Sequence, residues 1–201
     1  MVLKHESQGN LTHCELSDSP CGIKMYGRSY ARVRHNSLQR HSEAHILVTD
    51  GAEVRASYNG IISGRGSGVQ ASRCARCILS HNNIMCNQGM GVDASDRVLL
   101  EMRANRVSAN GQYGVRVDAA CCRLKANVIF GNQFAGLFLL HTSHALVHGP
   151  FLLLLCLCPC RKPCCPRLHY RLLTLCPTPT DPVGQSWPRG TGSVGRGAQG
   201  Q

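Results

Sequence analysis

Short runs in which apolar and polar residues alternate return along most of the chain every 22 or 23 residues. The common pattern is Asn-x-Ile/Val-x-x-Asn-x-x-x-Gly-Val/Leu, with looser matches in the early copies. The copies begin at Asn36, Asn59, Asn82, Asn105 and Asn127. With a partial copy before them, about six rungs cover residues 10–148. A repeat of this length is typical of a solenoid, in which each unit buries its apolar face against its neighbours.

Superposing the copies places apolar residues at every second position. One such column contains the pairs Ile23/Met25, Ile46/Val48, Val69/Ala71, Val92/Ala94, Val115/Val117 and Leu137/Leu139. A period of two indicates a strand with one buried face. Two further columns, around Leu79 and Ile84, give three short strands per rung. The pattern therefore predicts an all-β fold, a parallel β-helix, and no segment has the periodicity of a leucine-rich-repeat helix or a helical pair.

Two residue types mark the turns between the predicted strands. The five Asn residues that open the copies stack one above another, so their amides can hydrogen-bond along the axis as a ladder. Gly68, Gly91, Gly114 and Gly136 each precede a buried aliphatic residue. Glycine there suits a positive φ or a close approach by the neighbouring rung. Both roles are structural, and the sequence assigns no catalytic, cofactor-binding or metal-binding residue.

The composition changes near Pro150. Residues 149–201 hold six of the thirteen cysteines, most of the prolines and a Gly-rich end, which predicts an irregular, disordered tail. Residues 1–9 are expected to form an N-terminal extension. The apolar run Phe151–Cys158 is too short to span a bilayer, so no membrane segment is predicted. The Leu152–Leu155 part of this run is expected to cap the last rung.

The net charge of +11 favours an acidic or phosphorylated partner. Aromatic residues make up 5% of the chain, which leaves little to stack bases, so nucleic acid is not an expected ligand. The N-terminus has no apolar secretory signal, and the thirteen cysteines are expected to be reduced thiols. The expected location is the cytosol or the nucleus.

Few acidic residues are placed for catalysis. Asp50 and Asp96 share a column two rungs apart, but Arg73 lies between them, which indicates a surface charge ladder. Asp93 beside Arg116 is likewise an ion pair. Because no column holds two adjacent acids, the pair of carboxylates about 5 to 9.5 Å apart that glycoside hydrolysis needs is not predicted.

The cysteine and histidine motifs receive structural interpretations. Cys74-x-x-Cys77 resembles half a zinc site, but Cys77 falls in a buried column and no second pair follows at finger spacing. His41 and His45 occupy turn positions that hold Gly64 and Gly68 on the next rung, which indicates irregular turn filling. Nine arginines are either solvated strand positions or a face for an acidic partner. They are Arg28, Arg32, Arg34, Arg55, Arg65, Arg73, Arg76, Arg103 and Arg106.

The segment from Asn127 to Leu140 resembles a rung of the right-handed β-helix repeats in the β-helical F-box-only proteins (F-box only proteins 10 and 11). The resemblance covers residues 10–148, and a β-helical SHC-binding protein is a second match. It implies a non-catalytic, substrate-recognition scaffold of an SCF-type ubiquitin ligase, with a protein substrate as its partner. Since no F-box segment is found, the Skp1 adaptor is expected to bind only a longer form.

A carbohydrate-active β-helix enzyme, a hydrolase or a lyase, is the alternative function. It requires a groove with catalytic side chains within reach of one another. The fold does not choose between a scaffold and an enzyme, because one fold carries many functions.

Overall fold

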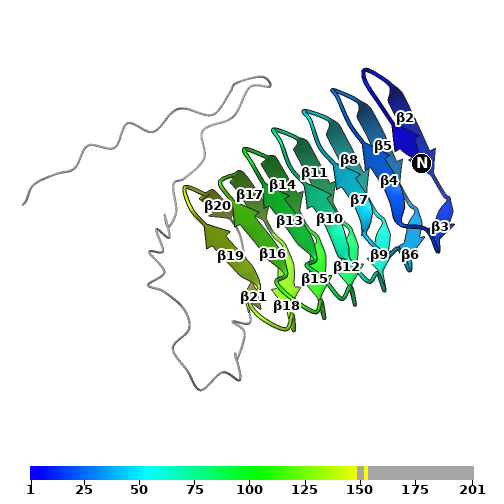
Figure 1. Cartoon of the computed structure of the whole chain (residues 1–201). Coiled ribbons are helices and arrows are strands. Elements are labelled where there is room, and N and C mark those ends of the chain that lie inside the picture. The colour runs from blue at the N-terminus through cyan, green and yellow to red at the C-terminus, as the bar shows by residue number, and fades with distance from the viewer. Residues whose placement is uncertain (149–151, 154–201) are drawn as a thin grey trace, which may run out of the picture.

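The computed structural model, described for residues 1–148 and 152–153, is a coil of short strands around one axis (Figure 1). Equivalent strands of successive rungs pair in parallel and build three seven-stranded sheets. The described residues contain strands and turns and no helix. The all-β parallel solenoid that the repeat predicts is therefore confirmed.

The three sheets, called sheet A, sheet B and sheet C here, follow one another along each rung. Sheet A contains β1 (Val2–Leu3), β4 (Cys21–Met25), β7 (Ala44–Val48), β10 (Ser67–Ala71), β13 (Val92–Ser95), β16 (Val115–Asp118) and β19 (Leu137–Leu140). Sheet B contains β2 (Gln8–Thr12), β5 (Tyr30–Arg34), β8 (Glu53–Ser57), β11 (Arg76–Ser80), β14 (Leu99–Arg103), β17 (Cys121–Lys125) and β20 (His144–His148). Sheet C contains β3 (Glu15–Ser17), β6 (Ser37–Gln39), β9 (Gly60–Ile62), β12 (Asn83–Met85), β15 (Arg106–Ser108), β18 (Val128–Phe130) and β21 (Leu152–Leu153).

The register follows the 22- or 23-residue step that the repeat predicts. Val92 of β13 pairs with Val115 of β16, and Ile84 of β12 pairs with Val107 of β15. Val115 and Val117 are fully buried, whereas Arg116 between them faces outward. A slip of one residue would turn the whole apolar column toward solvent, so burial of an aliphatic core fixes the register.

The asparagines that open the repeats form a continuous hydrogen-bonded row inside the turn between sheets B and C. The side-chain Nδ2 of each of the first four donates to the Oδ1 of the next asparagine at 2.9 to 3.1 Å. Each Oδ1 also accepts the backbone N–H of the preceding asparagine. All members are buried: Asn36, Asn59, Asn82, Asn105 and Asn127. The row satisfies backbone groups that the turn would otherwise leave unpaired.

The repeated glycines are required by the closeness of neighbouring rungs. A Cβ atom on Gly68, Gly91 or Gly114 would lie 2.6 Å from the carbonyl oxygen of the glycine one rung further on. For Gly114 that oxygen belongs to Gly136. None of these glycines has a positive φ. Of the two reasons that the sequence leaves open, close approach is therefore the one that applies.

Both ends of the coil extend beyond the predicted repeat limits. β1 already pairs with β4, with Val2 opposite Lys24, so the coil begins before residue 10. At the other end, Leu152 and Leu153 pair with β18 as the last strand of sheet C. Part of the run expected to cap the coil thus adds a strand to it. The predictions for the tail, including its disorder and its cysteines, concern residues 149–151 and 154–201, which lie outside the described residues.

Among the described residues, no helix is long and apolar enough to cross a membrane.

Candidate functional site

The charge column expected from the sequence lies at the turns between sheets A and B. Arg73 Nη1 is 3.3 Å from Asp50 Oδ1, so the guanidinium pairs with the acid on one side. On the face of sheet A, Arg116 contacts Asp93 in a two-point ion pair, with Nε–Oδ1 2.8 Å and Nη2–Oδ2 3.1 Å. These contacts match the ion pairs inferred from the repeat, and neither brings two carboxylates together.

The cysteines of the coil are placed for packing. Cys77 and Cys122 are buried, and loss of solvent raises the pKa of each thiol to about 12. A thiol with so high a pKa is neither a nucleophile nor a ready metal ligand at neutral pH. Within the described coil, no three His, Cys, Asp or Glu side chains gather closely enough to hold a metal ion.

A second polar row, which the sequence reasoning missed, runs through the turn between sheets C and A. Asn87 Nδ2 donates to Asn110 Oδ1 at 3.0 Å, and Asn110 Nδ2 donates to Asn132 Oδ1 at 2.9 Å. Histidines continue it toward the N-terminus: His45 Nε2 lies 2.9 Å from Asn87 Oδ1, and His41 Nδ1 lies 2.6 Å from His45 Nδ1. The signal for this row was the second Asn of the repeat, which has the same period as the first.

Both histidines occupy space that glycine leaves open. A Cβ on Gly64 would lie 2.5 Å from His45 Nε2, and a Cβ on Gly22 would lie 2.8 Å from His41 Cε1. His41 and His45 are fully buried. The inference that they fill irregular turns is therefore consistent with their geometry.

Burial of His45 predicts that the fold weakens in mild acid. Loss of solvent is the main cause that lowers the pKa of His45 from 6.5 to about 4, and burial also lowers the pKa of His41. Above pH 6.5 the folded and unfolded chains both hold the ring neutral. As the pH falls toward 4, His45 binds a proton in the unfolded chain but stays neutral in the folded chain. The free energy of unfolding should fall by about 3 kcal/mol across that window.

Urea unfolding at a series of pH values from about 7.5 to about 3.5 measures this loss in the free energy of unfolding. Equal stability at both ends of the window where His45 should titrate would contradict the prediction.

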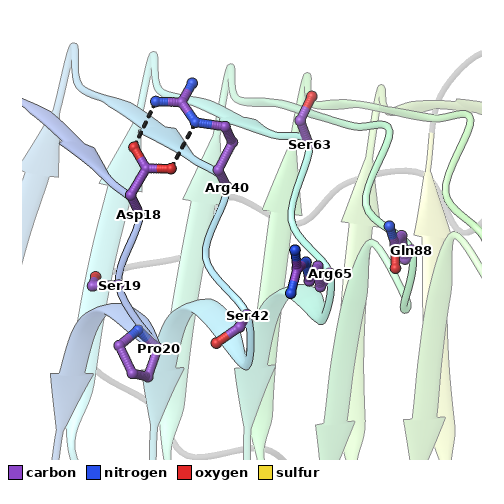
Figure 2. Close-up of a pocket in the computed structure, with 8 residues that line it drawn as sticks. All are labelled: Asp18, Ser19, Pro20, Arg40, Ser42, Ser63, Arg65 and Gln88. Atoms are coloured by element: carbon purple, nitrogen blue, oxygen red, sulfur yellow. Dashed lines mark hydrogen bonds and ion pairs between the residues drawn. The ribbon is translucent and has the colours of Figure 1, made fainter.

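A pocket of about 460 Å³ opens at the turns between sheets C and A, lined by Asp18, Arg40, Arg65, Gln88 and neighbouring small residues (Figure 2). Arg40 and Asp18 form a two-point ion pair, with Nη2–Oδ2 at 2.6 Å. The bond from Arg40 lowers the pKa of Asp18 to about 2, so both groups are charged at neutral pH. The lining offers cations for an anion, but its one carboxylate is paired and it has no histidine to serve as a base.

The C-terminal rungs of sheet A carry a different cluster. Arg116 and Asp118 alternate with buried valines on β16, so both project from the outer face about 6.6 Å apart along the strand. His141, in the turn after β19, lies one rung further on. Its Nδ1 is 2.5 Å from Asp118 Oδ1, and its side chain is 72% exposed against 25% for Asp118. Phe138 pairs directly above Arg116 and stacks on Tyr113 with ring centres 4.4 Å apart.

This cluster can move a proton. A carboxylate that accepts the Nδ1–H of a histidine fixes its tautomer and leaves the Nε2 lone pair free to act as a base. Asp93 uses the Nε and Nη2 of Arg116, so other N–H donors of the guanidinium remain for an anion. A base and a cation on one outer face suit proton abstraction next to a carboxylate, because the cation offsets the charge that develops.

Sequence reasoning did not find this cluster. It assigns His141 no role and interprets Arg116 only as the partner of Asp93. The hydrogen bond from His141 to Asp118 runs between adjacent columns, so a column-by-column reading separates the two residues. A comparison of neighbouring columns one rung apart would have brought them together.

The comparisons with known proteins agree on the fold. The family model described as "Right handed beta helix region" matches residues 2–151. No curated protein matches the chain significantly. Among solved structures, the chain is similar to a double mutant of the periplasmic alginate epimerase AlgG, with a TM-score of 0.60 and 20% sequence identity. The likeness covers 73% of this chain and 35% of that chain, so this chain spans about a third of its length.

The expectation of a non-catalytic ubiquitin-ligase scaffold is wrong. The structural match is to an alginate epimerase, an enzyme that shares the β-helix fold, and no match is to an F-box protein. The same finding contradicts the expectation that the chain is not an enzyme. At 20% identity the likeness establishes the fold and not the activity.

Proposed function

This chain belongs to the right-handed β-helix family, and on that premise we propose that it is a carbohydrate-active enzyme that acts on a uronic acid polysaccharide. The proposed reaction begins with removal of the proton on the carbon that bears the sugar carboxylate. The likeness to an alginate epimerase supports the substrate class, because alginate is such a polysaccharide. The observation that carries the proposal is His141 bound to Asp118, which shares the outer face of β16 with Arg116.

Each side chain of the cluster has a separate part. His141 Nε2 takes the proton, and Asp118 orients the ring and stabilises the imidazolium that forms. Arg116 binds the sugar carboxylate and offsets the charge of the carbanion, while Asp93 holds the guanidinium in place. The stacked rings of Tyr113 and Phe138 offer a flat apolar surface beside this site for the sugar ring.

The intermediate can then follow one of two balanced courses. A proton from water, delivered to the opposite face of the carbon, inverts its configuration and breaks no chain bond, which is epimerisation. Alternatively, the electron pair forms a double bond to the neighbouring carbon, the glycosidic C–O bond there breaks, and the departing oxygen takes a proton from water, which is lyase chemistry. Both courses share the step performed by His141.

Replacing the proposed base tests the proposal. We expect His141→Gln to lower the rate of alginate conversion by about 100-fold, the usual contribution of a positioned base. Because the His141 side chain is 72% exposed, the unfolding midpoint should stay within the error of the wild type. Conversion is followed by proton NMR of the polysaccharide, which detects both inverted sugars and unsaturated chain ends.

His144→Gln is the matched control, since His144 is also exposed, lies three residues away and faces outward from sheet B. It should convert alginate at the wild-type rate. Wild-type conversion by His141→Gln, or no conversion by the wild-type chain, would count against the proposal.

A further inference from the structure

Positive charge gathers on one of the three outer faces of the coil. The outward positions of sheet B carry seven Arg or Lys side chains against two carboxylates, Glu53 and Glu101. The cations are Arg32, Arg34, Arg55, Arg76, Arg103, Arg123 and Lys125. The outer face of sheet A has Lys24 and Arg116 against Asp93 and Asp118, so it is balanced. The excess charge therefore lies on a face away from the proposed catalytic cluster.

The two carboxylates neutralise cations in the middle of sheet B. Glu53 contacts Arg55 and Arg76, and Glu101 contacts Arg76 at 3.2 Å. Arg103 and Lys125 have no ion-pair partner among the described residues, and both are exposed. They lie opposite each other on β14 and β17, one rung apart. These two cations are available to an anion from outside.

A stack of rings runs along the corner beside these cations. His13, His35, Tyr58 and His81 succeed one another on four rungs, with ring centres 4.8 to 5.1 Å apart and planes within 6°. All four side chains are exposed. The spacing is that of the rungs themselves, about 4.8 Å. The repeat thus imposes a parallel stack on whatever rings occupy this turn.

The stack ends at His81, because the next two rungs carry Ala104 and Ala126 at the same position. One rung beyond His81, the stack position therefore carries a methyl group in place of a ring. Arg103 and Lys125 immediately precede these alanines, and Arg106 follows Ala104 by two residues with its guanidinium 4.5 Å from the Phe130 ring centre. The place where the ring stack stops thus has Arg103 and Arg106 close to it in the sequence, and Lys125 pairs with Arg103 one rung further on.

We propose that this basic corner, formed by His81, Arg103, Ala104, Arg106 and Lys125, is a second binding site for an acidic polysaccharide. One sugar ring stacks on His81 above Ala104, and its carboxylate contacts Arg103 and Lys125. The ligand class rests on the proposed function, since a uronic acid chain presents a flat ring and a carboxylate together. Because sheets A and B face different directions, the corner holds the polymer without entering the catalytic cluster.

Affinity electrophoresis of the full chain in gels containing alginate measures binding, and the His141→Gln background keeps conversion of the polymer slow during the run. We expect Arg103→Gln with Lys125→Gln to weaken binding by about 10-fold, and His81→Ala, which leaves both basic side chains in place, to weaken it by about 5-fold. Arg28→Gln with Arg97→Gln is the charge-matched control, since both arginines are exposed in turns between sheets A and B. It should weaken binding less than about 3-fold, because distant exposed charges are screened.

Equal weakening by the corner pair and the control pair would overturn the inference, as would binding to duplex DNA that matches binding to alginate. Unchanged binding by the corner variants would also overturn it, and retained alginate conversion by the same corner substitutions made with His141 intact would leave the proposed function standing. Conversely, corner-dependent binding, with no conversion by the wild-type chain, would support the corner and refute the catalytic proposal.

Discussion

Replacing Asn105 with alanine is expected to lower the free energy of unfolding by about 4 kcal/mol. The Asn105 side chain donates to the carbonyl oxygen of Leu79 at 2.8 Å and to Asn127 Oδ1 at 2.9 Å. Its Oδ1 accepts from both the backbone N–H and the Nδ2 of Asn82. Alanine leaves these partners buried without it, and each unsatisfied buried group costs roughly 1 to 3 kcal/mol.

Urea unfolding of the full chain measures the change, with Asn83→Ala as the control. Asn83 is exposed, and among the described residues its Nδ2 bonds to the sulfur of Met85. Its replacement should change the free energy of unfolding by less than about 0.5 kcal/mol. If Asn105→Ala were as mild as the control, the asparagine row would not be a main support of the turns.

The second large effect is expected from Gly64→Asn and its rescue by His45→Gly. The backbone N–H of Gly64 already donates to Asn87 Oδ1 at 3.0 Å, as an asparagine of the row does. Alone, Gly64→Asn drives a side chain into His45 Nε2 and should cost about 3 kcal/mol. Alone, His45→Gly leaves a cavity and should cost a similar amount. Together they restore the asparagine and glycine found on the following rungs, so most of the loss should be recovered.

A double-mutant cycle in urea measures the coupling, which we expect to reach about 3 kcal/mol. Gly60→Asn is the control, because a Cβ at Gly60 meets no atom within 4 Å and the residue has no positive φ. The double variant should also lose most of the acid sensitivity attributed to His45. Simple addition of the two single effects would show that the histidine does not replace a member of the row.

The fold could be predicted because its determinants repeat. Val92, Val115 and their equivalents are apolar at the same position of each rung. Parallel pairing in one register buries them together. The asparagine row and the close glycines follow from the same period. The repeat predicts that His41 and His45 fill turns, but it does not predict their hydrogen bonds. Those bonds depend on the space that Gly22 and Gly64 leave on neighbouring rungs.

The candidate sites could not be predicted in the same way, because their contacts cross between columns. His141 meets Asp118 diagonally, and the end of the ring stack at His81 is visible only when four rungs are aligned in space. The expected function of an F-box-only protein failed for a related reason. The Asn and Gly positions that carried it are set by the turns of the coil, so proteins with unrelated functions share them.

Exchange of hydrogen at the reacting carbon tests the central claim most directly. The full chain is incubated with alginate in D₂O, and deuterium on the carbon that bears the carboxylate is measured by NMR and mass spectrometry. The proposed mechanism predicts incorporation by the wild-type chain and an approximately 100-fold slower rate with His141→Gln. Alginate that remains free of deuterium after prolonged incubation with the folded wild-type chain would contradict it.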